Sequence, residues 1–92
     1  MSRPPLHALL GFATAARLGN LTRAAEAMHL TVSALSHQIR AVEERLGQCL
    51  FERGARGVKL TEEGRVLYDS IKPHLDAIEL ALPPRQRRRD DA

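Results

Sequence analysis

The side chains best suited to chemistry lie together in the stretch TVSALSHQIR, residues 31–40. Placed on a helical wheel at about 100° per residue, this stretch and the residues after it separate into two sides. One side carries an apolar stripe that we expect to be buried: Leu35, Ile39, Val42 and Leu46. The opposite side carries polar groups: Ser33, His37, Arg40 and Glu44, with Ser36 at its edge. Such groups can act in catalysis or form hydrogen bonds with a polar partner.

Catalysis or metal binding requires convergent side chains, and the sequence gives little sign of them. Ser36 and His37 are adjacent, so their side chains diverge on a helix. The histidines have no ligand spacing with the single cysteine: His7, His29, His37 and His74. We expect Cys49 to be a small apolar residue near a hairpin and not a nucleophile. The chain is therefore predicted not to be an enzyme, with no catalytic residue, no metal site and no cofactor.

Recognition of nucleic acid suits the polar side better. Its first half has no acidic residue, and Glu43 and Glu44 come only near the end. A helix face that merely meets solvent usually mixes Glu with Lys at i,i+4, although solvent exposure would be the commoner reading of this face alone. Serine can bond base edges or phosphates, and Arg40 can pair with guanine or a phosphate. We therefore interpret the polar side as a surface that reads DNA.

Three helices would position this surface. The first is expected from Pro4 or Pro5 to about Leu18, stopped by Gly19-Asn20. Thr22 is predicted to cap a second, short helix from Arg23 to about His29. Thr31 can cap the third, from Val32 to Leu46, and Gly47 ends it. About three residues separate the second and third helices, which is typical of a helix-turn-helix.

A hairpin and a long helix follow. Leu50-Phe51 and Val58 to Leu60 are predicted strands around a glycine-bounded turn, residues 54–57. Basic residues lie on this projecting loop: Arg53, Arg56 and Lys59. Beside a helix that reads a groove, they favour contact with phosphates or the minor groove. Thr61 then caps a helix that starts with Glu62 and Glu63 and reaches about Leu82. Pro73 should bend it.

The last helix carries an apolar heptad seam: Ile71, Leu75, Ile78 and Leu82. Leu67 and Tyr68, one turn earlier, should pack on the chain's own domain. From Ile71 onward the helix is expected to extend past this small body, so we predict that the seam meets a second copy of the chain. A dimer would present two recognition helices to a two-fold-related site.

Several fragments together resemble the N-terminal DNA-binding domain of the LysR-type transcriptional regulators: TRAAE, SALSHQI, VEERLG, LFER and LTEEG. The resemblance covers about Leu6 to Leu82, and the SHQI run and RGARG turn point to the branch of glycine-cleavage and beta-lactamase regulators. It implies a mainly α fold: a winged helix-turn-helix of three helices plus a short β-hairpin wing, followed by a long linker helix through which two chains dimerise.

The resemblance also assigns residues. It places Thr22 and Arg23 at the phosphate backbone and Arg53 and Arg56 in the wing. The full set of predicted DNA-binding residues is Thr22, Arg23, Thr31, Val32, Ser33, Ser36, His37, Arg40, Arg53, Arg56 and Lys59. In one departure, Val32 stands where many members have glutamine, so it can offer only an apolar contact, for instance to a thymine methyl. In another, His29 stands where the turn often has glycine.

The implied organisation is a winged helix-turn-helix at 1–61, a linker and dimerisation helix at 62–82, and the basic start of an interdomain linker at 83–92. Family members are longer and carry a C-terminal effector-binding domain, so we expect this chain to be the DNA-binding part alone, with any small-molecule effector bound by the part it lacks. The alternative is a winged-helix module that binds proteins without reading DNA.

Composition sets limits on these interpretations. The 92 residues are 43% apolar and 27% charged, as in soluble globular chains. Aromatic residues are only 3%, so we expect a core of Leu, Ala, Val and Ile. Residues 83–92 hold four arginines and two aspartates, which supply +2 of the net +3, so the placement of charge matters more than its total. The roles of Arg87, Arg88 and Arg89 are left open.

The same composition bears on location. One cysteine allows no internal disulfide and suits a reducing compartment. No apolar run reaches the roughly 18 residues of a membrane span. The N-terminus imitates a short signal peptide, but Pro4, Pro5 and His7 interrupt it. Its apolar residues instead follow helical spacing: Leu6, Leu9, Leu10, Ala13 and Ala16. We therefore predict a cytoplasmic protein with no membrane partner.

Overall fold

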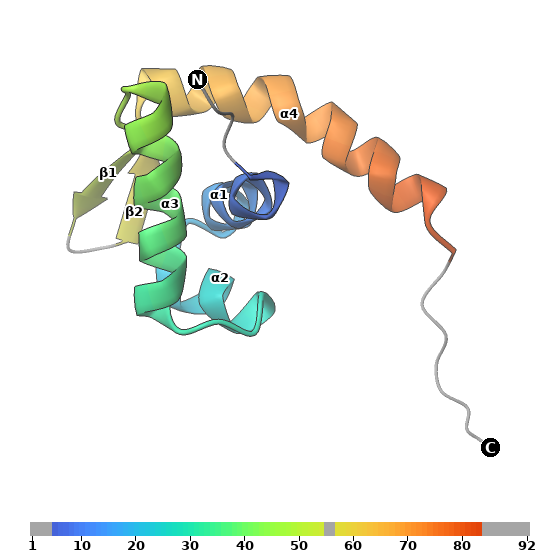
Figure 1. Cartoon of the computed structure of the whole chain (residues 1–92), viewed down its shortest axis with the longest axis horizontal. Coiled ribbons are helices and arrows are strands. Elements are labelled where there is room, and N and C mark those ends of the chain that lie inside the picture. Colours follow the sequence, from blue (N-terminus) through green and yellow to red (C-terminus); the bar gives the residue numbers. More distant parts are fainter. Residues whose placement is uncertain (1–4, 55–56, 84–92) are drawn as a thin grey trace.

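The computed structural model of the chain describes residues 5–54 and 57–83. Its elements follow the order α1 (Leu6–Leu18), α2 (Leu21–Ala27), α3 (Val32–Leu46), β1 (Phe51–Gly54), β2 (Gly57–Leu60) and α4 (Glu62–Ala81). Figure 1 shows α1 at the centre, α2 below it, α3 and the hairpin on one side, and α4 across the top. The prediction of a mainly α winged helix-turn-helix followed by a long helix is confirmed.

The link between α1 and α2 is a tight left-handed turn. Gly19 has φ 66°, and its N–H donates to the Ala15 carbonyl at 2.8 Å. Asn20 is the N-cap of α2, because its side-chain oxygen accepts from the Arg23 N–H at 2.9 Å. The prediction that Thr22 caps this helix was wrong, since α2 begins at Leu21 and Thr22 lies inside its first turn. Asparagine and threonine are both good caps, and the chain uses the earlier one.

The turn between α2 and α3 is made without glycine. His29 adopts φ 58°, a left-handed conformation in which a Cβ atom approaches the carbonyl oxygen. The Leu30 N–H closes the turn by donating to the Ala25 carbonyl at 2.8 Å. Ala24 and Ala25 are both buried, so their small side chains let α2 lie close to its neighbours.

His29→Gly is expected to raise the free energy of unfolding by about 0.5–1 kcal/mol, because glycine relieves the left-handed strain at a smaller cost in unfolded-state entropy. Urea denaturation of the two proteins measures the difference. His29→Ala is the control and should not stabilise the protein, since alanine keeps the Cβ atom. A loss of stability in His29→Gly would contradict this explanation of the turn.

Helix α3 follows the predicted bounds and caps. The Thr31 hydroxyl accepts from the Ala34 N–H at 3.0 Å, and Gly47 ends the helix with φ 68°. Leu35, Ile39 and Val42 are fully buried. Leu46, predicted to complete this stripe, is instead exposed, because the helix ends there, beyond the reach of α1 and α2.

An aromatic cluster lies at the centre of the core, which corrects the expectation of a purely aliphatic interior. Phe12 is fully buried, and its ring centroid lies 5.4 Å from that of Phe51 and 6.5 Å from that of Tyr68. These are all the aromatic residues of the chain. Each comes from a different element, so the cluster joins α1, β1 and α4. Few aromatic residues therefore suffice, because all of them meet at one point.

The hairpin is antiparallel and is held to the helices at both ends. Its register pairs Phe51 with Leu60 and Gly54 with Gly57. At the far end, Gly57 lies against Gly19, and a Cβ atom there would stand 2.6 Å from the Gly19 carbonyl oxygen. At the near end, the Glu43 carboxylate accepts from the backbone N–H groups of Leu50 at 2.8 Å and Phe51 at 3.3 Å. These contacts with the helices stabilise the hairpin, because two strands alone are at best marginally stable in water.

Helix α4 begins at a joint with the start of β1. The Thr61 hydroxyl accepts from the Gly64 N–H at 3.0 Å and donates to the Cys49 carbonyl at 2.6 Å. The helix continues through Pro73 to Ala81, and Figure 1 shows its axis changing direction in its second half as it passes beyond the body of the domain. The predicted cap and the predicted bend are therefore both present.

Candidate nucleic-acid interface

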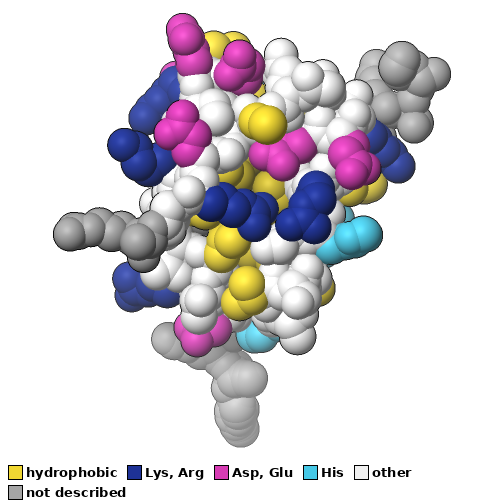
Figure 2. Space-filling view, turned by 90° about the vertical axis from the view of Figure 1, so that its left-hand side faces the viewer, with side chains coloured by type: hydrophobic (Ala, Val, Ile, Leu, Met, Phe, Trp, Pro, Cys, Tyr) yellow, Lys and Arg dark blue, Asp and Glu magenta, His cyan; other side chains and the backbone are white. Residues whose placement is uncertain are grey.

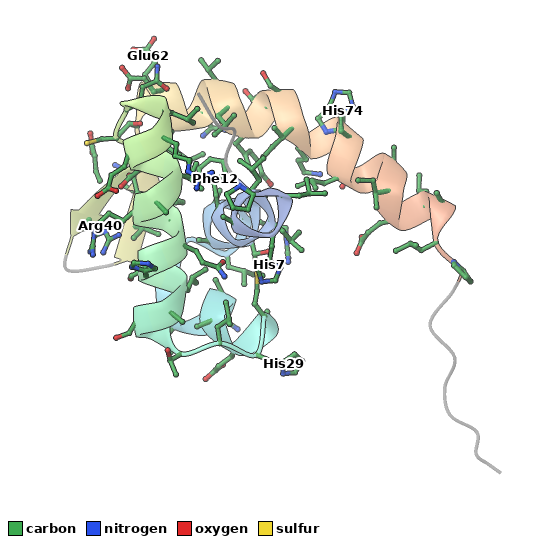
Figure 3. The ribbon with its side chains drawn as sticks, viewed as in Figure 1. His7, Phe12, His29, Arg40, Glu62 and His74 are labelled. Atoms are coloured by element: carbon green, nitrogen blue, oxygen red, sulfur yellow. The ribbon has the colours of Figure 1, made fainter. Side chains whose placement is uncertain are left out.

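The outer face of the first half of α3 is exposed and free of acidic residues. Thr31, Ser33, His37 and Arg40 are exposed, Val32 is 41% exposed, and Ser36 is half-buried. Figure 3 shows Arg40 pointing away from Phe12 and the core. We call this set of six residues the recognition face.

The first turn of α3 holds no acidic residue, as is also the case for α1 and α2, whereas α4 starts with Glu62 and Glu63. The macrodipole favours acids at a helix N-terminus, so the lack of them in α3 does not serve the helix itself. A helix start with free positive potential and small hydroxyl side chains is suited to a close anionic partner.

Helix α2 and the hairpin add a second group of predicted residues. Thr22, Arg23 and Arg53 are exposed. Thr22 and Arg53 line the same surface hollow of about 450 Å³ between the start of α2 and the hairpin, which Asn20, Gly54 and Gly57 also line. Residues from two distant parts of the sequence therefore meet at one edge of the domain.

The two sides of the hairpin differ in charge. The register pairs Glu52 with Lys59 and Arg53 with Val58, and directly paired residues project from the same side of an antiparallel sheet. The carboxylate of Glu52 thus accompanies Lys59, while Arg53 projects from the other side, beside the hollow. Of the wing cations, Arg53 is the better placed to meet an anion. Arg56 lies outside the described residues, as do Arg87, Arg88 and Arg89.

The face formed by α3 and the hairpin carries charges of both signs. Figure 2 shows Lys and Arg side chains across the middle of this face, while most of the acidic side chains lie in its upper part, with further basic side chains at the edges. The upper part corresponds to the end of α3 and the start of α4, where Glu43, Glu44, Glu62 and Glu63 occur. The middle is therefore the part of this face best suited to an anion.

A second surface is a groove of about 860 Å³ between α1 and α4. Leu75 lines it together with four exposed leucine and isoleucine side chains: Leu6, Leu10, Ile78 and Leu82. Leu6 and Leu10 followed helical spacing in the sequence, but Leu6 is 67% exposed and Leu10 is 42% exposed. Ile71, predicted to start the intermolecular seam, is half-buried and packs against the domain's own core. The unpartnered surface therefore begins one turn later and includes α1.

Charged groups line the rim of this groove. Lys72 Nζ donates to Asp76 Oδ2 at 2.7 Å. This hydrogen bond and the charge of Asp76 raise the pKa of Lys72. Arg17 and Glu79 also line the groove. The rim thus carries both signs of charge around an apolar floor.

The histidines and acidic residues of the described part of the chain form no candidate metal site. Figure 3 shows His7, His29 and His74 on different elements, and residues 5–54 and 57–83 contain no cluster of three or more His, Cys, Asp or Glu side chains that could bind a metal ion. Cys49 is exposed and lies just before the hairpin, as its predicted position requires. It lies at the joint between α3 and β1, where its backbone and not its thiol has the structural role.

Residues 6–65 match the family model of the bacterial regulatory helix-turn-helix proteins of the lysR family. The chain belongs to the LysR family. This membership confirms the predicted resemblance, and because the family consists of transcription regulators, it also confirms that the chain is not an enzyme. Among the helices of the described residues, none has the length and apolar character needed to span a membrane.

Two curated transcriptional activators are among the proteins to which this chain is similar. The transcriptional activator AmpR of Rhodobacter capsulatus is 40% identical over 92 residues, covering 98% of this chain and 32% of the relative. The glycine cleavage system transcriptional activator of Escherichia coli K12 is 49% identical over 69 residues, covering 75% of this chain and 23% of the relative. The chain spans about a third or less of the length of these relatives.

Solved structures of LysR-family proteins share the fold. The DNA-binding domain of BenM, in complex with its benA site 1 DNA, superposes with a TM-score of 0.76 at 34% identity, covering 83% of this chain and 85% of that one. The hydrogen-peroxide-bound OxyR C206S mutant of Corynebacterium glutamicum gives a TM-score of 0.80 at 35% identity, covering 87% of this chain and 26% of that one.

Proposed function

We propose that this LysR-family chain is a sequence-specific double-stranded DNA-binding domain of a bacterial transcription regulator. The observation that carries the proposal is the recognition face: exposed, acid-free and polar, on the second helix of a helix-turn-helix. In this motif the N-terminal half of the second helix enters the major groove. The BenM domain of the same fold is bound to DNA in its structure.

The contacts divide into two kinds. Val32, Ser33, Ser36, His37 and Arg40 face the base edges and the adjoining backbone, where they determine sequence preference. The second kind comprises cationic or hydroxyl side chains of α2 and the wing that would hold phosphates: Thr22, Arg23, Arg53, Arg56 and Lys59. Thr31 lies at the junction, with its hydroxyl already capping α3.

The alternative of a protein-binding module finds less support on this face. Protein hot spots are enriched in Trp, Tyr and Arg, whereas Ser, Thr and Val are under-represented. The recognition face has one arginine, no Trp or Tyr, and several Ser, Thr and Val side chains. The apolar surface of the domain lies elsewhere, in the groove between α1 and α4.

A homodimer through α4 is the second part of the proposal. The groove exposes apolar side chains on both walls, as a site for a second helix would. Its rim carries Lys72 and Arg17 together with Asp76 and Glu79, so a two-fold-related copy can pair opposite charges. We assign Leu75, Ile78 and Leu82 of α4 to this interface, and Leu6 and Leu10 of α1 with them.

Ile78→Asp tests the dimer. The side chain is 48% exposed in the single chain, so the variant should fold, but burying an unpaired carboxylate in an apolar interface should weaken dimerisation about 100-fold. Sedimentation velocity measures the association, and DNA titration should show a parallel loss of affinity.

Leu80→Asp is the matched control, because Leu80 lies on the same helix, is 85% exposed and does not line the groove. It should sediment and bind DNA like the unmodified chain. Unchanged sedimentation of Ile78→Asp would contradict the interface.

Two further assignments belong to this proposal. A small-molecule effector, where one exists, would bind residues outside this chain, since regulation in the family is located beyond the DNA-binding part. Bacterial DNA lies in the cytoplasm, so a DNA-binding role places the protein there.

The proposed function is tested by titrating the chain against a duplex from the region upstream of its own gene and against a shuffled duplex, at several salt concentrations. We expect affinity for both to fall steeply as salt rises, with tighter binding to the upstream duplex. Equal affinity for both duplexes would reduce the role to nonspecific binding, and absence of binding at low salt would favour the protein-binding alternative.

A further inference from the structure

Val32 is an apolar exception on the recognition face. It is 41% exposed at the first residue of α3. Of the large apolar side chains exposed in residues 5–54 and 57–83, four line the groove between α1 and α4, and the others lie on α4 or at the end of α3. Val32 therefore has no share in the apolar surface that we assign to the dimer.

Local stability does not require a valine here. The cap of α3 is the Thr31 hydroxyl, and the buried stripe begins at Leu35. Valine has a lower helix propensity than alanine, because its branched side chain loses rotamer freedom. Since Val32 serves neither the cap nor the core, its exposed side chain is available for contact with a partner that approaches the recognition face.

The major groove offers one apolar feature to such a side chain, the C5 methyl group of thymine. Ser36 lies one turn further along α3, about 6 Å away for residues at i,i+4, so it would face a neighbouring base pair. We propose, resting on the DNA-binding function above, that Val32 selects a thymine through its C5 methyl group in each half-site of the target.

The test uses duplexes that the chain itself enriches from a random library. In an enriched duplex, each thymine is replaced singly by deoxyuridine, which removes the methyl group and leaves base pairing intact. One thymine of each half-site is expected to be sensitive, with affinity falling about fourfold, the value of one buried methyl-sized group. In Val32→Ala, which lacks both γ-methyl groups, the same replacement should have a much smaller effect.

Leu46→Ala is the matched control, since Leu46 is an exposed apolar residue at the opposite end of the same helix; it should keep the deoxyuridine sensitivity. Enrichment with no sensitive thymine, or sensitivity that persists in Val32→Ala, would overturn this inference and leave the proposed function intact. Failure of the library to enrich any sequence would overturn both.

Discussion

Ser33→Glu is expected to weaken binding to the upstream duplex about 100-fold while leaving the fold intact. Ser33 is the second residue of α3 and is exposed. A carboxylate there would meet the phosphates and acceptor-rich base edges of the groove, and juxtaposed like charges cost several kcal/mol. The same carboxylate at the start of α3 should interact favourably with the helix dipole, which is worth about 0.3–1 kcal/mol. The variant should therefore lose affinity for DNA while its free energy of unfolding rises slightly.

Ser70→Glu is the control, because it changes the net charge equally at an exposed serine of α4. Its affinity for DNA should stay within about threefold of the unmodified chain, since a distant surface charge is screened by salt. Fluorescence anisotropy gives the affinities, and thermal denaturation gives the stabilities. Equal losses of affinity in the two variants would mean that total charge matters and the recognition face does not.

Gly64→Ala is expected to lower the free energy of unfolding by about 3 kcal/mol. A Cβ atom at Gly64 would stand 2.1 Å from the Leu50 carbonyl oxygen and 3.0 Å from Leu60 Cδ2. The first of these atoms belongs to the backbone, so α4 and β1 would have to move apart. In the interior of a helix free of such contacts, the same change should stabilise by about 1 kcal/mol. A loss of stability in Gly64→Ala would therefore show that Gly64 lies against the Leu50 backbone.

Gly11→Ala provides the comparison, since Gly11 is also a buried glycine within a helix. Its added Cβ atom would lie 3.0 Å from Gln38 Oε1 and 3.0 Å from Leu35 Cδ1, both ends of side chains that can shift. We expect the free energy of unfolding to change by no more than about 1 kcal/mol. Urea denaturation should therefore rank Gly64→Ala far below Gly11→Ala, and the reverse order would show that the α4 joint is not tightly packed.

The helices were predictable because their signals are local. Glycine at 19 and 47 and threonine at 31 and 61 set the boundaries that the structure has, and periodic apolar residues identified the buried side of α3. Local sequence did not decide which of two nearby residues caps α2. Asn20 and Thr22 both suit the role, and the path of the chain out of the Gly19 turn decides in favour of Asn20.

Long-range packing accounts for the other errors. Helical spacing on α1 cannot distinguish residues that pack in the core from residues that contact a partner. The sequence therefore identified Leu6 and Leu10 as part of an apolar stripe but did not predict that they line the groove. The sequence also contained no sign that the Glu43 carboxylate accepts hydrogen bonds from the backbone N–H groups of Leu50 and Phe51. Because the hydrogen bond from Leu50 joins residues seven apart across the end of a helix, no periodicity indicates it.

The candidate site was predictable in residue types but not in arrangement. The acid-free polar side of α3 follows from the sequence alone. The shared hollow of Thr22 and Arg53, and the pairing of Glu52 with Lys59, depend on the register of the hairpin and on its attachment to Gly19. These features distinguish Arg53, which lines the hollow, from Lys59, which is paired with Glu52. The basic composition of the loop alone does not show this difference.

Amide chemical-shift mapping of the ¹⁵N-labelled chain, titrated with the upstream duplex, tests most directly whether the recognition face binds DNA. We predict that the largest shifts fall at residues 31–40, with a second group at Thr22, Arg23 and Arg53, and that Ser33→Glu abolishes both groups at the same DNA concentration. Shifts confined to the groove between α1 and α4, or spread evenly over the domain, would contradict the assignment of α3 as the DNA-reading helix.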